Sequence, residues 1–241
     1  MTHDMLYGRN AVLEALRAGR RRFVALSVLD TVRGDARVDE ILGRAGQLGI
    51  AVARPSRDEL DRLAPRGNQG VVLEATPYAY ATEAIPQPQS DGIILALDEL
   101  EDPRNAGALM RSAEAAGVSG VIFPERRAVE VTPAVVNASS GATEHLMIWR
   151  EKNLARWLSA ARDLGYWIIG LDGGEDSGNL FDADLPLPAV LIVGSEGRGL
   201  RRLTRERCDL LVRIPMYGAI ESLNAGAAGS IALYHLREYG G

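Results

Sequence analysis

Residues 189–200 read A-V-L-I-V-G-S-E-G-R-G-L, an apolar run that ends in a glycine-rich loop. Short runs rich in branched apolar residues are typical of strands buried on both faces of a parallel sheet. Runs of the same type predict further strands at residues 93–97, 120–123, 166–171 and 210–214. Helical stretches are predicted among them, at residues 106–116, 133–141, 153–164, 200–207 and 223–238. The alternation predicts an α/β domain whose parallel sheet is covered on both faces.

Ligands of such sheets bind at the carboxyl ends of the strands, which directs attention to the loops at 98–105, 194–199 and 215–224. The first loop contains a turn and Asn105, a residue suited to cap the helix that carries Arg111. The glycines of the second loop let a ligand approach the backbone, and Glu196 lies near the next helix. Ser222 and Asn224 of the third loop are natural caps of the last helix. Taken singly, each loop is explained by ordinary capping.

The N-terminal part predicts a second, smaller α/β domain. Asn10 is the expected cap of a helix that ends at Gly19, and Ser56 with Glu59 forms a capping-box pattern. The remaining elements are expected as strands at 23–29, 50–52 and 71–75 and a helix at 35–48. Prolines among polar residues then predict a linker. The predicted organisation is a domain at 1–76, a linker at 77–91 and a domain at 92–241.

Charge is distributed unevenly along the chain. The net charge is −5, which at first sight argues against a nucleic-acid partner. Residues 1–80 carry 12 arginines and 10 acids, a net charge of +2, whereas residues 81–241 carry −7. The first domain is therefore the expected site of contact with phosphates.

Several classes of protein are disfavoured by what the sequence lacks. The single cysteine, Cys208, excludes an internal disulfide and favours the cytoplasm. No signal peptide is expected at residues 1–10, and no apolar run approaches the roughly 20 residues of a membrane helix. The three histidines are too scattered to predict a metal site. Neither a Walker A motif nor a G-x-G-x-x-G or G-x-S-x-G motif is present.

Together the three loops resemble the signature motifs of the SpoU (TrmH-type) branch of the SPOUT RNA methyltransferases. The family patterns are N-x-G-x-x-x-R, G-x-E-G-x-G and I-P-M-x-G-x-x-x-S-L-N; the chain has them at 105–111, 194–199 and 214–224. The stretches 7–12 and 68–72 resemble the substrate-binding domain found in many members. One departure is visible, since residues 225–228 read A-G-A-A where the family usually has V-S-V-A.

The resemblance implies a fold, a cofactor and a substrate. It implies a C-terminal SPOUT domain with a deep trefoil knot and an N-terminal domain similar to ribosomal protein L30e. It also implies a cytoplasmic homodimer that uses S-adenosyl-L-methionine, without a metal or a membrane. The nearest group is the bacterial 23S rRNA guanosine-2′-O-methyltransferases, so the expected reaction is methyl transfer to a ribose 2′-hydroxyl of 23S rRNA.

Site residues follow from the same resemblance, position by position. The residues that match catalytic positions are Asn105, Arg111, Glu196, Ser222 and Asn224. The residues that match cofactor-binding positions are Gly194, Ile214 and Leu223. Arg111 matches the residue to which the family assigns the role of general base. Because a guanidinium group stays protonated at physiological pH, we expect Arg111 instead to bind a neighbouring phosphate and stabilise the developing 2′-alkoxide.

The basic first domain is expected to anchor the RNA. Its candidate phosphate contacts are Arg9, Arg20, Arg21, Arg22 and Arg66. Three alternatives stay open: the same reaction on tRNA or another rRNA site, a non-catalytic RNA-binding protein of ribosome assembly on the same fold, and a nucleotide-dependent oxidoreductase. The complete motif set disfavours the second, and the missing G-x-G-x-x-G disfavours the third.

Overall fold

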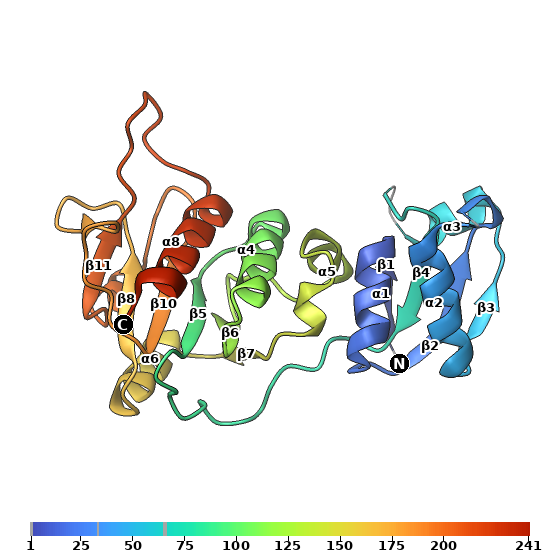
Figure 1. Ribbon diagram of the computed structural model, residues 1–241, viewed down its shortest axis with the longest axis horizontal. Coiled ribbons are helices and arrows are strands. Elements are labelled where there is room, and N and C mark those ends of the chain that lie inside the picture. The colour runs from blue at the N-terminus through green and yellow to red at the C-terminus, as the bar shows by residue number, and fades with distance from the viewer. Residues whose placement is uncertain (1, 33, 65–66) are drawn as a thin grey trace. The chain divides into compact units, whose positions relative to one another are not determined.

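A computed structural model describes residues 2–32, 34–64 and 67–241 of the chain (Figure 1). It divides into two compact units, the first made of Met1–Ala79 with Glu130–His145 and the second of Tyr80–Val129 with Leu146–Gly241. The sequence assigned residues 130–145 to the domain at 92–241, whereas the structure packs them with the first unit. Each unit has its own sheet and core.

The first unit is built on a four-stranded sheet with the order β1-β4-β2-β3. β4 pairs antiparallel with β1 and β2, and β2 pairs parallel with β3. The strands are β1 (Asp4–Tyr7), β2 (Phe23–Val28), β3 (Ala51–Ala53) and β4 (Val71–Ala75). The helices are α1 (Arg9–Ala18), α2 (Ala36–Gln47), α3 (Arg57–Leu63) and α5 (Pro133–Ala138), with short 3₁₀ turns at Asp30–Val32 and Ala142–Glu144.

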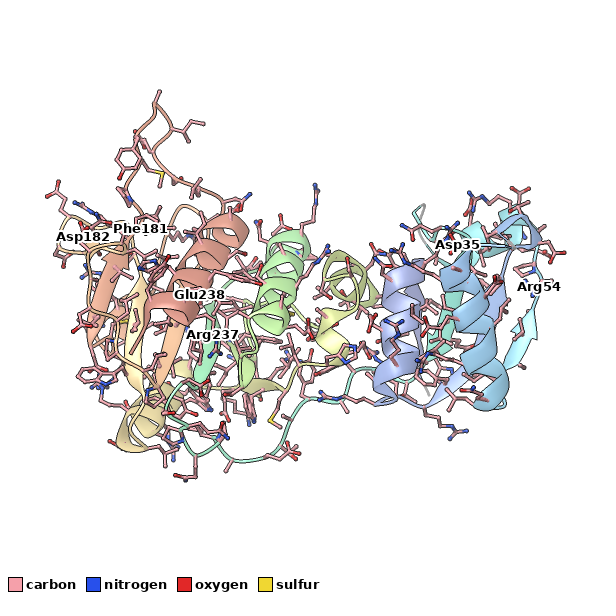
Figure 2. All side chains as sticks on the ribbon, viewed as in Figure 1. Asp35, Arg54, Phe181, Asp182, Arg237 and Glu238 are labelled. Carbon is pink, nitrogen blue, oxygen red and sulfur yellow. The ribbon has the colours of Figure 1, made fainter. Side chains whose placement is uncertain are left out.

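Local capping chemistry sets most of the helix ends in this unit. The Ser56–Glu59 capping box is confirmed at the start of α3, and Gly19, with a φ of 62°, ends α1 as expected. Asp35, labelled in Figure 2, caps α2 by accepting hydrogen bonds from two backbone amides. The expectation for Asn10 is wrong, because α1 already begins at Arg9 and Asn10 lies inside the helix.

Residues 130–145 complete the first unit through a buried ion pair. The Arg21 guanidinium donates to the Glu144 carboxylate at 2.7 and 2.9 Å and to Asp4 at 2.8 Å. The side chains of Arg21 and Glu144 are 1% and 0% exposed. Asn137 of α5 also donates to the backbone of Tyr7 at 3.0 Å. Contacts between residues more than 100 positions apart carry no periodic signal, so the sequence pattern could not place this segment.

The second unit contains a seven-stranded, entirely parallel sheet with the order β7-β6-β5-β10-β8-β11-β9. The predicted parallel sheet is confirmed. Its strands are β5 (Ile93–Asp98), β6 (Gly120–Pro124), β7 (Ile148–Glu151), β8 (Trp167–Leu171), β9 (Gly178–Asn179), β10 (Ala189–Gly194) and β11 (Leu210–Arg213). Its helices are α4 (Pro103–Ala115), α6 (Leu154–Asp163), α7 (Arg202–Arg205) and α8 (Ala225–Tyr239).

Helices cover both faces of this sheet, which explains why the central strands are apolar throughout. Val190 and Ile192 of β10 belong to a buried cluster with Leu158 of α6. A Cβ on Gly229 of α8 would lie 2.9 Å from Val193 of the same strand, so α8 covers the opposite face. α8 packs beside α4 (Figure 1). Every residue of β5 and β10 is buried.

Arg237, labelled in Figure 2, fastens the end of α8 to the end of α4. Its guanidinium donates to the carbonyl oxygens of Ala116 and Gly117 at 2.8 and 3.0 Å. Ala116 is the C-terminal cap of α4 and Gly117 follows it, so their carbonyl oxygens have no partners within the helix. The arginine therefore satisfies them and holds the two helices together.

Two expectations about the helices of this unit are corrected. α4 begins at Pro103 because Asp102 is its cap and proline suits the first helical position, so Asn105 lies in the first turn and does not cap the helix. The helix expected at 200–207 is the four-residue α7. In the described residues 2–32, 34–64 and 67–241, no helix is long and apolar enough to cross a membrane.

Candidate functional site

The carboxyl ends of four parallel strands meet at one edge of the sheet. Gly194 at the end of β10 is in register with Asp98 at the end of β5. Val193 is in register with Leu171 at the end of β8, and Leu171 with Val212 of β11. The loops that follow these strands therefore emerge side by side, where ligands of parallel sheets bind.

A cleft of about 780 Å³ opens at this edge. Its volume lies within the range of small-molecule sites. The predicted site residues that line it are Gly194, Glu196, Ile214, Ser222 and Leu223. The complete lining consists of residues 171–174, 193–199, 213–216, 221–223, 225 and 228. The second and third motifs thus share one cavity, together with the end of β8.

Gly194 lies where the chain folds back sharply on itself. A Cβ at this position would lie 2.3 Å from the carbonyl carbon and oxygen of Gly199, so no other residue fits. Ser195 and Gly199 form an isolated antiparallel bridge, and Gly199 has a φ of +64°, which favours glycine. The resulting tight loop brings its backbone to the wall of the cleft.

Glu196 connects this loop to the first motif. Its Oε1 accepts a hydrogen bond from Nδ2 of Asn105 at 2.5 Å and a longer one from the backbone amide of Ala225 at 3.4 Å. One carboxylate therefore contacts the start of α4 and the start of α8. Asn105 does not line the cleft, but it is held directly behind a residue that does.

Asn224 is the cap of α8, as its position in the sequence suggested. Its Oδ1 accepts a hydrogen bond from the backbone amide of Ala227 at 2.7 Å. The cap fixes where α8 begins and so positions Ser222 and Leu223, which precede it on the wall of the cleft. Ser222 is exposed and lines this cavity from the third loop.

Arg111 is not among the residues that line the cleft. It lies on α4 six residues after Asn105, and its side chain is exposed. The structure therefore brings four of the five predicted catalytic residues to one place, in the cleft or beside it, and leaves the fifth on the surface of the same helix as Asn105.

Comparison with known proteins is consistent with these motifs. Residues 92–234 match the model of the SpoU rRNA methylase family. The chain belongs to the SpoU rRNA methylase family. Residues 5–81 match the model for RNA 2′-O-ribose methyltransferase substrate binding. This SpoU family member is thus an RNA methyltransferase of the SpoU/TrmH type that carries a substrate-binding domain.

Relatives match this SpoU family member along most of its length. A TrmH family tRNA/rRNA methyltransferase of Bacillus subtilis is 39% identical, covering 97% of this chain and 95% of the relative. The AdoMet-bound rRNA methyltransferase of Sinorhizobium meliloti has a TM-score of 0.81 at 26% identity, covering 98% of this chain and 87% of its own. The SpoU methyltransferase AviRb of Streptomyces viridochromogenes, solved with AdoMet, has a TM-score of 0.80 at 27% identity, covering 98% and 89%. The A. aeolicus TrmH/SpoU tRNA-modifying enzyme covers only 64% of this chain and 77% of its own, with a TM-score of 0.56 at 26% identity.

An ion pair between a buried aspartate and a partly exposed arginine, which the sequence did not reveal, supports the second motif. Asp98 ends β5, is fully buried and accepts hydrogen bonds from the backbone amide and Nε of Arg201 at 2.9 and 2.6 Å. The pair joins the beginning of the first loop to the residue just past the second. The sequence did contain a signal, because Asp98 follows an apolar strand directly. It was interpreted as the first residue of the loop at 98–105.

The arginines predicted to contact RNA have different surroundings in the first unit. Arg22 is exposed, and so is Arg20, whose Nη2 donates to the carbonyl of His145 at 3.3 Å. Arg9 is half-buried and pairs with Asp35 at 2.6 Å. The expectation for Arg21 is wrong: its guanidinium is buried against Glu144 and cannot reach a phosphate.

Arg66, the remaining member of that set, lies outside the described residues. In the described part of the chain, no cluster of His, Cys, Asp and Glu is arranged to hold a metal ion. The expectation that the protein needs no metal stays a prediction.

Proposed function

We propose that this chain transfers the methyl group of S-adenosyl-L-methionine to the ribose 2′-hydroxyl of a guanosine in 23S rRNA. The observation that carries the proposal is the 780 Å³ cleft in which the second and third SpoU motifs meet. The tight turn at Gly194 and the backbone around Ile214 and Leu223 are suited to hold the cofactor by main-chain groups. The exposed Glu221 on the wall of the cleft also suits a sulfonium cation.

Methyl transfer depends mainly on how the two reacting groups are positioned. When bound, the cofactor supplies a methyl group activated by the positive sulfur. The chain has to hold the ribose hydroxyl in line with that methyl group and stabilise the oxygen as its proton leaves. We assign the stabilisation of the developing alkoxide to Arg111 and the orientation of that arginine to Glu196 and Asn105. Ser222 and Asn224 shape the third loop. Holding the two reactants in this geometry can by itself account for a large share of the increase in reaction rate.

Two features of the second unit support a homodimer. Arg111 is exposed on α4 outside the cleft, and the loop between β11 and α8 projects away from the sheet (Figure 1). That loop exposes Tyr217 and Ile220 at 91% and 76%. Apolar side chains at such exposure favour burial in an interface. We propose that a second copy covers this loop and that the partner subunit's Arg111 completes the cleft.

The choice of rRNA rests on the first unit. The rRNA methyltransferase of S. meliloti matches 98% of this chain, whereas the tRNA-modifying enzyme of A. aeolicus matches 64%. We attribute the difference in coverage to the basic substrate-binding domain at the N-terminus of this chain. The exposed Arg20 and Arg22 are the proposed phosphate contacts of that domain, together with the half-buried Arg9. The trefoil knot and the cytoplasmic location stay predictions of the family resemblance.

The test is methylation of unmodified RNA. The protein is incubated with labelled S-adenosyl-L-methionine and RNA from cells lacking ribose methylation, and the modified nucleotide is mapped. A 2′-O-methylguanosine in 23S rRNA is expected. Modification of tRNA would redirect the substrate assignment. Absence of label in every RNA, together with absence of cofactor binding by calorimetry, would contradict the enzymatic proposal and favour an assembly protein.

A further inference from the structure

Asp172 brings an oriented carboxylate into the cleft from β8, a strand that none of the three motifs includes. It follows Leu171 at the end of β8 and lines the cavity. Its Oδ2 accepts a hydrogen bond from Nε of Arg205 at 2.8 Å. No group among residues 2–32, 34–64 and 67–241 donates a hydrogen bond to its Oδ1. One oxygen is therefore fixed and the other is left as an acceptor.

The surroundings of Asp172 hold this carboxylate in place. Arg205 also bonds to Asp176, so the guanidinium is anchored on two sides. A Cβ on Gly199 would lie 2.9 Å from Oδ1, and a Cβ on Gly174 would lie 3.2 Å from Oδ2. Two glycines therefore lie beside the carboxylate, and their lack of a side chain leaves space for it. The Asp172 side chain is only 14% exposed, which limits competition from water.

The other two carboxylates of the cleft have different surroundings. Glu196 is exposed and accepts two hydrogen bonds through Oε1, both from neutral amides, those of the Asn105 side chain and the Ala225 backbone. Glu221 is exposed, and in the described part of the chain it has no cationic partner. A cationic group of a ligand would therefore be attracted most to Glu221. Asp172 already pairs with Arg205 through Oδ2, so the open Oδ1 can accept a hydrogen bond from a neutral donor such as a hydroxyl.

We propose that Asp172 Oδ1 accepts a hydrogen bond from a ribose hydroxyl of the cofactor's nucleoside. The assignment rests on the proposed function, because it presupposes that the cleft holds S-adenosyl-L-methionine. It makes Asp172 a cofactor-binding residue beyond the three SpoU motifs. Arg205 is then a positioning residue, because it holds the carboxylate by its other oxygen, Oδ2.

The test compares ligands that differ in one hydroxyl. Calorimetry measures binding of S-adenosylhomocysteine and its 2′-deoxy and 3′-deoxy analogues. The wild type should bind one deoxy analogue about 10- to 100-fold more weakly, as expected for loss of a hydrogen bond to a charged group. In Asp172→Ala that preference should fall to within about threefold, because the acceptor is gone. Asp172→Asn retains an acceptor oxygen and should retain part of the preference.

Asp176→Ala is the matched control. It removes the outer, 65%-exposed partner of Arg205 and leaves Asp172 in place, so the preference should persist. An unchanged preference in Asp172→Ala would overturn the inference. Loss of affinity for S-adenosylhomocysteine but not for 5′-methylthioadenosine would also overturn it, since the carboxylate would then bind the amino group. If the wild type bound none of these ligands, the proposed cofactor itself would be refuted, and this inference with it.

Discussion

Asn105 and Glu196 lie 91 positions apart in the sequence and are joined by a hydrogen bond of 2.5 Å. The bond links the first turn of α4 to the glycine-rich loop after β10. It can form because Asp102, and not Asn105, caps α4, which leaves the Asn105 side chain available. The first and second SpoU motifs are therefore one structural unit behind the cleft.

Replacing Glu196 tests that link. In Glu196→Gln, one acceptor oxygen becomes an amide donor, which opposes the Asn105 amide and weakens the charge-assisted bond. We expect kcat to fall by about 10- to 100-fold, while cofactor affinity changes by less than about threefold. Glu206→Gln, at an exposed carboxylate paired with Arg202, should behave as wild type. An equal loss in both variants would contradict a specific role for Glu196.

Arg111 can be tested by its pH dependence. If it stabilises the alkoxide by charge, Arg111→Lys should lose about 100- to 1,000-fold in kcat/KM, because lysine lacks the planar fork of donors. Its pH–rate profile should keep the wild-type shape. Near-normal turnover with a new inflection in the profile would instead support proton abstraction by the side chain at this position. The measurement is single-turnover methylation across a pH series.

The buried Arg21–Glu144 pair should matter for stability. Glu144→Gln leaves the guanidinium of Arg21 buried with only Asp4 as its counter-ion. We expect the free energy of unfolding of the first unit to fall by about 3 kcal/mol or more in urea denaturation. Glu40→Gln breaks the exposed pairs with Arg17 and Arg44, and its cost should be about 1 kcal/mol or less. Equal costs would show that burial of the pair is unimportant.

Gly229 and Gly43 should respond to alanine with opposite signs. A Cβ on Gly229 would lie 2.4 Å from Leu109 and 2.9 Å from Val193, so Gly229→Ala forces α8 away from α4 and β10. A loss of about 1–3 kcal/mol is expected. Gly43 in α2 has nothing within 4 Å of its Cβ position. Gly43→Ala should therefore stabilise the protein by about 0.5–1 kcal/mol through helix propensity. Urea midpoints measure both.

Cys208 should be slow to react although it is the only thiol of the chain. Burial is the main cause that raises its pKa to about 12. At pH 8.5 the native thiol should react with iodoacetamide about 100- to 1,000-fold more slowly than in urea, because little thiolate is present. Equal rates in the two states would contradict the burial.

The same thiol should make stability depend on pH. A folded-state pKa above the unfolded one means that the neutral thiol favours the native state. Its contribution is complete below the unfolded pKa of about 8.5 and is lost as the pH rises toward the folded pKa of about 12. The free energy of unfolding should therefore fall more steeply in this range for the wild type than for Cys208→Ala.

Residues 225–228 read A-G-A-A where the family usually has V-S-V-A, and the structure gives a physical reason for this difference. Gly226 lies against the first turn of α4, where a Cβ would be 3.2 Å from Oδ1 of Asn105. Smaller residues than the usual V-S-V-A therefore let α8 approach α4 closely. The sequence showed the smaller residues, but only the packing of α8 against α4 showed that Gly226 makes room for Asn105.

Much of the second unit was predictable because its signals are local. The apolar runs predicted five strands of the parallel sheet, and Asn224 marked the cap of α8. The sequence missed β1 and β7, which have four residues each, and β9, which has two. So short a strand is defined by its partner in the sheet more than by its own pattern.

By itself, the sequence determined the α/β class, the parallel sheet, the positions of the three loops and the family to which the chain belongs. These depend on residue periodicity, capping and short motifs, all of which act within a few positions. Tertiary structure alone decided that Glu196 holds Asn105, that Asp98 holds Arg201, that Asp172 faces the cleft, and that Glu144 buries the arginine expected to bind RNA. Each of these is a contact of a charged side chain with a group distant in the sequence. Such partners leave no periodic trace, because one hydrogen bond or ion pair fixes them only after the chain has folded.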